Sequence, residues 1–322
     1  MRFVAFTVAL LIVGLVGLGA VPLAMERDAQ GRDWQVGQVG GSMLFAYSVA
    51  FARVLPFAAG LGAGIGLLQR LRRKRRRALL NAQVQRHDSS AVIVHWLVAI
   101  GMILGTVSAA LLLRWVPRFL PLESIYVLHF AASALVVLAV AHHLTYEGVG
   151  GGRALLVRSW SEVKSALAET FGYLGVFGRE GAAFGLQLPS GLRRALVSLL
   201  KRRSIEVAPE GKFAATERVI SYPGWAVLVG LLTLTGFVKA LRYLYPVDGV
   251  VLQFTTWLHD ALAIWVVVWL LIHIVPVLII PANWPMLRSI FTGRVSRRYA
   301  QQRHPLWLAE LLEQSRDAAS NR

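Results

Sequence analysis

Two histidines in the last apolar stretch of the chain, His259 and His273, have the residue type and the spacing that suit metal ligation. They are fourteen residues apart. Because fourteen residues make nearly four turns of an α-helix, one helix would present both imidazoles on the same face, about 21 Å apart along its axis. A polar ring in hydrocarbon is costly without a partner, so histidines inside a membrane helix usually face the protein interior and carry a function. The spacing predicts two metal-ligand positions at two membrane depths.

The composition predicts a polytopic membrane protein. Hydrophobic residues make up 56% of the 322 residues and charged residues only 16%, which is too apolar for a soluble globule. Six stretches are long enough to span a bilayer: residues 3–24, about 43–68, 91–113, 124–145, 219–238 and 251–280. The formal net charge of +17 would suit nucleic acid, but its distribution along the chain argues against a nucleic-acid partner.

The positions of Lys and Arg outside the spans predict the orientation. Residues 69–87 carry eight Lys and Arg, residues 146–218 eleven and residues 283–322 seven. The other three connections between spans hold six in total. Because basic residues accumulate on the cytoplasmic side, we expect these three segments and both termini in the cytoplasm, with the spans in a bacterial inner membrane. Residues 3–24 are either a retained helix or a cleaved signal peptide, which would leave the mature N-terminus outside.

We expect four parts along the chain. Residues 1–24 form the signal peptide or first transmembrane helix, and residues 25–90 an external segment, a transmembrane helix and a basic cytoplasmic linker. Residues 91–290 form a four-helix domain with a cytoplasmic loop at 146–218, and residues 291–322 a cytoplasmic tail. In the second span Arg53 and Pro56 interrupt the apolar run, so we expect that helix to extend towards Leu71 and Arg53 to lie near the outer interface.

Chain direction sorts the membrane histidines by depth. His129 is expected near the outer face, where it can meet His259. The inner His273 can meet any of three candidates: His95, His142 and His143. Spacing favours His143, because it follows His129 by fourteen residues, but spacing does not exclude the others.

Two pairs of imidazoles at two depths predict two bis-histidine haems, one near each membrane face. The chain has no cysteine, which excludes thiolate-held iron-sulfur clusters and covalent c-type haem, so the haems would be non-covalent b haems. Bis-histidine ligation leaves no open position on iron, which favours electron transfer over chemistry at the metal. The remaining histidines, His87 and His304, fall in basic polar segments and are expected to be solvated.

Several short motifs carry a family resemblance. Residues 292–300 read TGRVSRRYA and are followed by His304-Pro305-Leu306-Trp307. Four histidine motifs precede them along the chain, in this order: Val94-His95-Trp96, Leu128-His129, Leu258-His259 and Ile272-His273. In this order and spacing the chain resembles the cytochrome b (gamma) subunit of membrane-bound formate dehydrogenases. The resemblance runs from about residue 91 to residue 312, with a weaker part at Gly31-Arg32-Asp33-Trp34.

The resemblance implies an all-α fold, a four-helix dihaem bundle preceded by one or two N-terminal transmembrane helices. It implies that His95 and His273 hold the inner haem and that His129 and His259 hold the outer haem, which ranks His95 above His143. It also implies partners: an iron-sulfur (beta) and a catalytic (alpha) subunit, with membrane quinone as electron acceptor. This chain would then hold no catalytic site for formate.

The quinone site is where the chain departs from the family. An asn-ala-gly-gln stretch lies near the family's quinone, and here Ala214-Ala215-Thr216-Glu217 stands in its place, without either amide. Thr216 and Glu217 are the candidate quinone or proton site, since quinone reduction consumes protons. The alternative is that Glu217 is a plain helix-start carboxylate.

Other interpretations stay open. The same scaffold could serve a hydrogenase or a thiosulfate or polysulfide reductase, a self-contained quinol or superoxide oxidase is a third possibility, and a haem-free transporter or assembly protein belongs to a different class. Within the long loop, residues 148–152 lack the neighbours of a phosphate-binding loop and are expected to form a turn. Residues 192–203 mix apolar and basic positions at helical spacing, which predicts an interfacial helix on anionic lipid.

Overall fold

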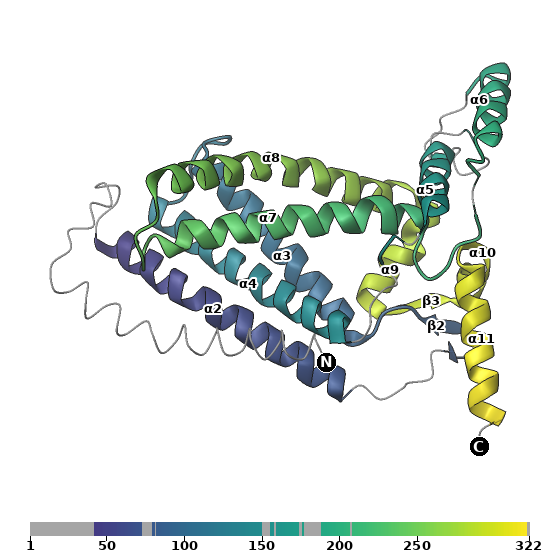
Figure 1. Cartoon of the computed structure of the whole chain (residues 1–322), viewed down its shortest axis with the longest axis horizontal. Coiled ribbons are helices and arrows are strands. Elements are labelled where there is room, and N and C mark those ends of the chain that lie inside the picture. Colours follow the sequence, from purple (N-terminus) through teal and green to yellow (C-terminus); the bar gives the residue numbers. More distant parts are fainter. Residues whose placement is uncertain are drawn as a thin grey trace. The chain divides into compact units, whose positions relative to one another are not determined.

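The computed structural model describes residues 42–72, 79–80, 82–149, 155–157, 159–173, 176, 188–206 and 208–320. Within them five helices are long and apolar enough to cross a membrane (Figure 1). They are α2 (Ser42–Leu71), α3 (Ser89–Leu112), α4 (Leu122–Val149), α7 (Tyr222–Leu241), which a π-helical turn η2 (Glu217–Ser221) precedes, and α8 (Gly249–Ile279). This confirms a helical, multi-pass membrane protein. The first predicted span, residues 3–24, lies outside the described residues.

Helix α4 extends beyond its predicted span. Helix α4 continues to Val149, so the predicted loop at 146–218 begins inside a helix, and the expected glycine turn is wrong at Gly148. The other glycines of that run lie outside the described residues. Helix α2 ends at Leu71, as predicted, and contains Pro56. The Nε and Nη2 atoms of Arg53 are buried there without a hydrogen-bond partner among the described residues.

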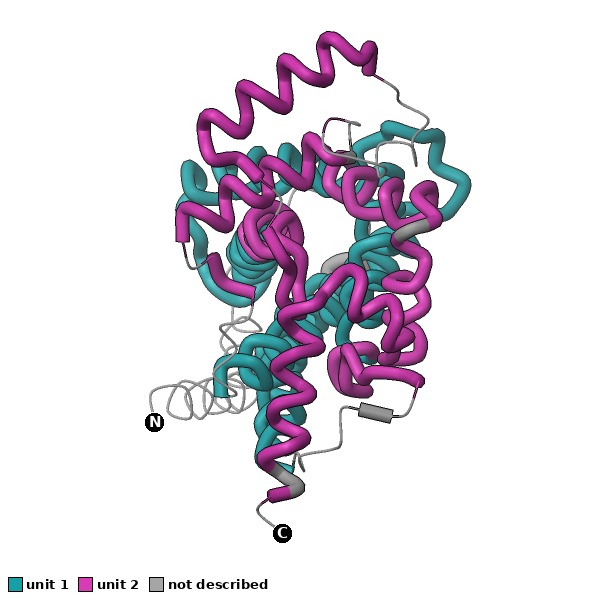
Figure 2. The backbone as a smooth tube through the Cα atoms, turned by 90° about the vertical axis from the view of Figure 1, so that its right-hand side faces the viewer, with its two compact units in different colours: residues 1–73, 93–152, 228–267 teal, residues 74–92, 153–227, 268–322 magenta. Residues whose placement is uncertain are grey.

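The chain divides into two compact units, which Figure 2 colours separately. Unit 1 comprises residues 1–73, 93–152 and 228–267, and unit 2 comprises residues 74–92, 153–227 and 268–322. Unit 1 therefore holds α2, α4, most of α3 and parts of α7 and α8. Unit 2 holds the connections that the basic-residue count assigns to one side of the membrane.

In unit 1, α2 packs along α4, where glycines allow a close approach (Figure 1). Gly62 and Gly66 are one turn apart on α2 and lie against the backbone carbonyl groups of Leu138 and His142 on α4. A Cβ atom at Gly66 would lie 2.6 Å from the carbonyl oxygen of His142. Small residues four positions apart are the usual means by which two membrane helices come close together.

Unit 2 contains a small antiparallel sheet that the sequence did not lead us to expect. Its strands lie in the order β1 (Leu79–Leu80), β2 (Gln83–Gln85) and β3 (Arg294–Ser296). Val84 on β2 pairs with Val295 on β3, so the basic linker and the C-terminal tail share one sheet. Gly293 enters β3 with φ of 71°, a left-handed conformation that suits glycine.

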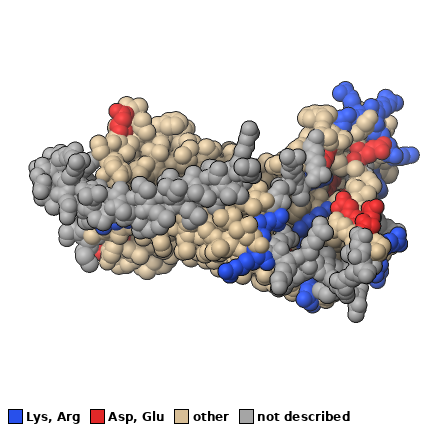
Figure 3. Space-filling view, turned by 60° about the horizontal axis from the view of Figure 1, so that its bottom comes forward, with Lys and Arg blue, Asp and Glu red and all other residues tan. Residues whose placement is uncertain are grey.

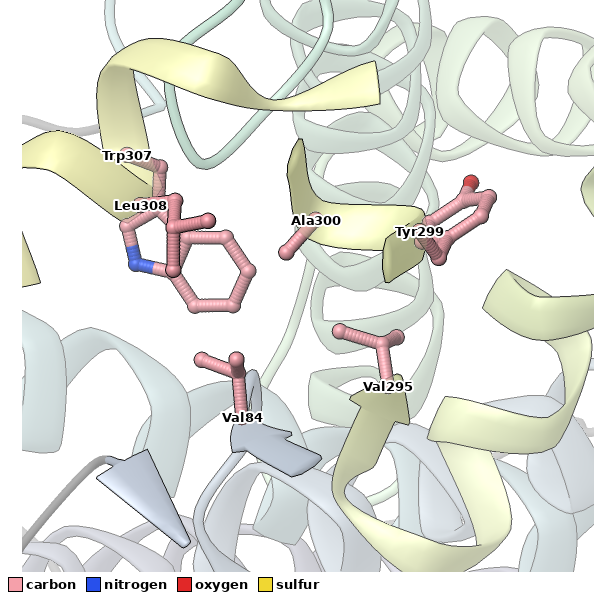
Figure 4. Packing of buried hydrophobic residues seen from close by; sticks show 6 residues of the cluster. All are labelled: Val84, Val295, Tyr299, Ala300, Trp307 and Leu308. Carbon is pink, nitrogen blue, oxygen red and sulfur yellow. The ribbon is translucent and has the colours of Figure 1, made fainter. Parts of the chain in front are cut away.

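Short helices complete unit 2: α5 (Trp160–Tyr173), α6 (Ser190–Arg202), α9 (Trp284–Thr292), α10 (Arg297–Arg303) and α11 (Pro305–Ser320), with a 3₁₀ turn η3 (Pro281–Asn283) before α9. An apolar core joins the sheet to α10 and α11. Figure 4 shows its six buried residues: Val84, Val295, Tyr299, Ala300, Trp307 and Leu308.

Basic side chains gather over part of unit 2. Helix α6 confirms the predicted helix at 192–203 and ends with Lys201 and Arg202, while Leu192 and Leu199 are about half exposed, at 50% and 55%. Figure 3 shows a group of Lys and Arg side chains over the elements of this unit. The combination of exposed leucines and basic side chains is typical of a helix that lies on a membrane surface.

Candidate functional site

The candidate site in unit 1 is built on two facing histidines. His129 on α4 and His259 on α8 have ring centroids 6.2 Å apart and ring planes 78° apart. Metal-imidazole bonds are about 2 Å long, so two rings that bind one metal from opposite sides would have centroids about 6 Å apart. The structure thus brings together the two residues that the sequence pairs at the outer face, at a separation that bis-imidazole ligation requires.

Each of these rings is held by a hydroxyl group from another helix. Ser108 Oγ on α3 lies 3.0 Å from His129 Nδ1, and Thr235 Oγ1 on α7 lies 2.8 Å from His259 Nδ1. Both hydroxyl groups also donate to a carbonyl oxygen of their own helix, Ser108 to Gly105 at 2.9 Å and Thr235 to Leu231 at 2.8 Å.

These contacts select one tautomer for both rings. A hydroxyl group has one proton, and here it is donated to the helix carbonyl, so the oxygen accepts a hydrogen bond from Nδ1–H of the imidazole. A neutral ring with a proton on Nδ1 keeps the lone pair on Nε2, which is the form that binds a metal. The hydrogen bonds among the described residues leave Nε2 of both His129 and His259 without a partner.

The long helices of unit 1 differ in how closely they pack. Directly packed helices lie about 8–10 Å apart, which brings many Cα atoms close together. Helices α2 and α4 pack in this way, whereas the Cα atoms of α3, α7 and α8 in this unit come within 8 Å of another long helix at isolated positions only. At Gly236 on α7, a Cβ atom would lie 3.5 Å from Cε1 of His259, which is ordinary contact.

Charged groups lie beside His259. Lys239 Nζ on α7 is 3.5 Å from Oδ1 of Asp260, the residue after His259. Both side chains are partly exposed, at 27% and 40%, so the ion pair adds little stability. Arg242 and Asp260 also line an open hollow of about 430 Å³ together with Gln253, Thr256 and Trp257. Cationic side chains at this position suit the carboxylates of a porphyrin.

The inner histidines are distributed over both units. His95 on α3 belongs to unit 1 and contacts Trp96 edge-on at 5.8 Å, whereas His273 on α8 belongs to unit 2 and contacts Trp225 edge-on at 5.9 Å. Their pairing stays a prediction, as does the alternative ligand His143, which is half-buried on α4.

His142 is engaged by other side chains. Its Nε2 lies 3.0 Å from Oε1 of Gln69 on α2, and its ring stacks on Tyr146 with centroids 5.7 Å apart. These contacts and the close approach of Gly66 give His142 a packing role between α2 and α4. Of the three candidates for the inner ligand, it is therefore the least suited to bind iron.

Glu217 and Thr216 lie in a polar cluster of unit 2. Glu217 Oε2 accepts a hydrogen bond from the backbone N–H of Ala214 at 2.9 Å, as a helix-start carboxylate does. The same carboxylate forms an ion pair with Arg86, with Nη2 to Oε2 at 3.2 Å. The backbone N–H of Thr216 donates to Oε2 of Glu169 on α5 at 3.0 Å.

The expectation of a solvated His304 is wrong. Its side chain is 1% exposed, and both ring nitrogens have partners: Nε2 lies 2.7 Å from Nη1 of Arg86, and Nδ1 lies 2.9 Å from the carbonyl oxygen of Gly211. The partners are far away along the chain, so the surrounding basic sequence suggested solvent instead. No local signal in the sequence would have revealed this contact.

No known protein family matches the chain, and no curated protein is detectably similar to it. Among the described residues, no three His, Cys, Asp or Glu side chains converge as they would around a bare metal ion. A haem held by two imidazoles needs only two protein ligands, so this finding does not bear on the pair His129 and His259.

Proposed function

We propose that the chain is the membrane-anchoring dihaem cytochrome b subunit of a formate dehydrogenase-type complex. It takes electrons from an iron-sulfur subunit on the periplasmic side and passes them through two b haems to membrane quinone. The observation that carries the proposal is the pair His129 and His259, whose Nδ1 atoms are both held by hydroxyl groups and whose Nε2 atoms are both left for a metal.

Each residue of the outer site has a defined task. Haem, when bound, supplies reversible one-electron chemistry at its iron. Neutral His129 and His259 would hold the haem iron through Nε2. Ser108 and Thr235 fix the ring tautomer and orientation, as outer partners of metal-binding histidines generally do. Lys239 and Arg242 would neutralise the haem carboxylates.

For the inner haem we propose His95 and His273 as ligands, with His143 as the alternative to His95. The segments that unit 2 brings together support the proposal that the basic segments lie on one side of the membrane. Residues 79–80, 83–85 and 294–296 form one sheet, which supports placing the linker and the tail on the same face of the membrane. The excess of Lys and Arg favours the cytoplasmic face.

Absorption spectra of the purified full chain, oxidised and dithionite-reduced, test the proposal. We expect a b-type difference band and two haems per chain. His129→Ala and His259→Ala should each retain one haem, and His95→Ala and His273→Ala should each lose the other. His143→Ala serves as the matched control and should retain both haems. A chain that stays colourless after expression with ample haem would contradict the proposal and favour the haem-free class.

The attached enzyme is tested separately. Co-purification from the native membrane should recover an iron-sulfur subunit and a molybdenum-dependent formate dehydrogenase subunit. Recovery of a hydrogenase or of a sulfur-compound reductase would contradict the proposed formate dehydrogenase partner but not the proposed cytochrome b.

A further inference from the structure

A second polar site lies in unit 2, away from the histidines that we assign to haem. Arg86 stands at its centre and is 2% exposed. Its Nη1 contacts His304 Nε2 at 2.7 Å, and its Nη2 contacts both carboxylate oxygens of Glu217, at 3.3 and 3.2 Å. Glu210 Oε2 lies 3.4 Å from His304 Nδ1. Glu169 on α5 adds a third carboxyl group to this cluster, since its Oε2 accepts a hydrogen bond from Thr216, the residue before Glu217.

His304 is neutral in this arrangement and offers no positive charge to Glu210. Arginine only donates hydrogen bonds, so Nε2 of His304 must be the acceptor, and the ring proton on Nδ1 points to Gly211 O at 2.9 Å. Burial, with Arg86 next in importance, lowers the pKa of His304 to about 3. The contact of 3.4 Å between His304 and Glu210 is therefore not an ion pair at neutral pH.

Among the residues that the structure describes, Glu210 has no ion pair with a Lys or Arg side chain. Arg86 is engaged by Glu217, and Arg218 by Glu162 at 2.9 Å. Burial raises the pKa of Glu210 to about 8, and the neighbouring Glu169 and Glu217 act in the same direction. Burial also raises the pKa of Glu169, although the Thr216 amide and Arg303 oppose the shift. Arg86 and Arg218 lower the pKa of Glu210 by less than burial and the two neighbouring carboxyl groups raise it, so Glu210 holds its proton at neutral pH.

Two buried polar atoms point to a further occupant. Tyr299 Oη and Arg86 Nε are buried and have no hydrogen-bond partner among the described residues, and Tyr299 is only 7% exposed. In Figure 4 the Tyr299 ring points away from Trp307 and the other apolar residues, and it lies edge-on to His304 at 5.8 Å. Buried polar groups of this kind generally hydrogen-bond an ordered water molecule.

We propose that Arg86, Glu169, Glu210, Glu217, Tyr299 and His304 form a proton-binding site, in which Glu210 carries an exchangeable proton and water bound by Tyr299 and Arg86 connects it to the solvent. Proton release leaves a carboxylate on Glu210 and transfers the proton to that water. The binding of the proton does not require haem. Only its use, as a proton store for the quinone chemistry of this membrane subunit, rests on the proposed function.

An infrared pH titration of the purified full chain tests the site. We expect the stretching band of one protonated carboxyl group to disappear with a midpoint near pH 8. Glu210→Gln should abolish this band, whereas Glu206→Gln, at an exposed carboxyl on the same segment, should leave it unchanged. Glu169→Gln should move the midpoint to lower pH, because a like charge is removed. Tyr299→Phe should slow exchange of the proton with the solvent while the band remains.

The outcomes separate the two proposals. If no carboxyl band titrates above pH 7, or if Glu210→Gln retains it, the proton-binding site is refuted whatever the haem content. If the band titrates as expected in a chain without a b-type spectrum, the proton-binding site is supported and its use in quinone chemistry is refuted. The neutral amide of Gln imitates the protonated carboxyl in shape, so the thermal midpoint of Glu210→Gln at pH 6 should match that of the wild type and verify its folding.

Discussion

At the scale of single residues, a hydroxyl group on a neighbouring helix decides what an intramembrane histidine can do. Ser108 and Thr235 each donate to a carbonyl of their own helix and accept from an imidazole. Such back-bonding is common for Ser and Thr in membrane helices, but here the second lone pair of the oxygen also sets the tautomer of His129 and His259.

Thr235→Val tests this role. Valine keeps the shape but removes the acceptor of His259 Nδ1–H, so the ligand becomes a weaker electron donor and the outer haem's potential should rise by about tens of millivolts. Redox titration with optical detection measures the shift. Thr255→Val is the control, because Thr255 is buried on α8 and bonds the Val251 carbonyl at 2.8 Å without touching an imidazole. Equal shifts in both variants would contradict the role of Thr235.

His304 makes stability depend on acid pH. Its pKa is about 3 in the fold and about 6.5 when unfolded, so the unfolded chain binds the extra proton between these values. The contribution of His304 is therefore complete above pH 6.5 and is lost as the pH falls towards 3, by about 2 kcal/mol at pH 5. In detergent, the difference in thermal midpoint between wild type and His304→Gln should shrink from pH 7 to pH 5. A difference that is constant with pH would show that His304 does not titrate in this way.

At the scale of secondary-structure elements, glycine spacing determines which two membrane helices pack directly. Gly62 and Gly66 bring α2 against α4, and their spacing is a small-residue pattern that is visible in the sequence. Gly101 on α3 also lies close to α4, where a Cβ atom would be 3.1 Å from the carbonyl oxygen of Ala132. Elsewhere in unit 1, the Cα atoms of α3, α7 and α8 come within 8 Å of another long helix at isolated positions only.

Gly66→Ala should weaken the contact between α2 and α4. The added Cβ would lie 2.6 Å from the His142 carbonyl oxygen, and overpacking of this kind costs about 1–3 kcal/mol. Gly230→Ala on α7 is the matched control, because its Cβ would meet no atom within 4 Å. Thermal unfolding in detergent should show a lower midpoint for Gly66→Ala and an unchanged or higher one for Gly230→Ala. Equal midpoints would refute the close packing.

At the scale of the whole molecule, the charge distribution and the small sheet both favour a topology in which the linker after α2 and the segment after α9 lie on one side of the membrane. The sheet joins the linker after α2 to the segment after α9, and the basic residues gather in these connections. An odd number of crossings between the two strands would separate them. The four spans α3, α4, α7 and α8 lie between β2 and β3, which returns the chain to the same side.

Cysteine accessibility tests the topology directly, because the natural chain contains no cysteine to interfere. Glu206→Cys and Arg298→Cys, both at exposed positions of unit 2, should react with a membrane-impermeant thiol reagent only after the cytoplasmic side is opened. Phe119→Cys, in the connection between α3 and α4 where the side chain is 74% exposed, should react in intact cells with a permeable outer membrane. The reverse pattern would place the basic segments outside and invert the proposed direction of charge movement.

Membrane spans were predictable because they depend on local properties. An apolar run of bilayer length forms a helix whatever its neighbours are, since every backbone group must be satisfied within the segment. The five described spans and the pairing of His129 with His259 follow from that rule and from chain direction.

Contacts between distant segments were not predictable in this way. The partners of the imidazoles, 21 and 24 residues away, the sheet, and the burial of His304 beside Arg86, 218 residues away, all depend on how helices rotate and pack. A histidine in a basic segment is predicted to be solvated. In the folded chain, an acceptor and a donor from distant segments bind its two ring nitrogens. Which polar groups share a buried space is a property of packing in three dimensions, and the linear order of residues does not contain it.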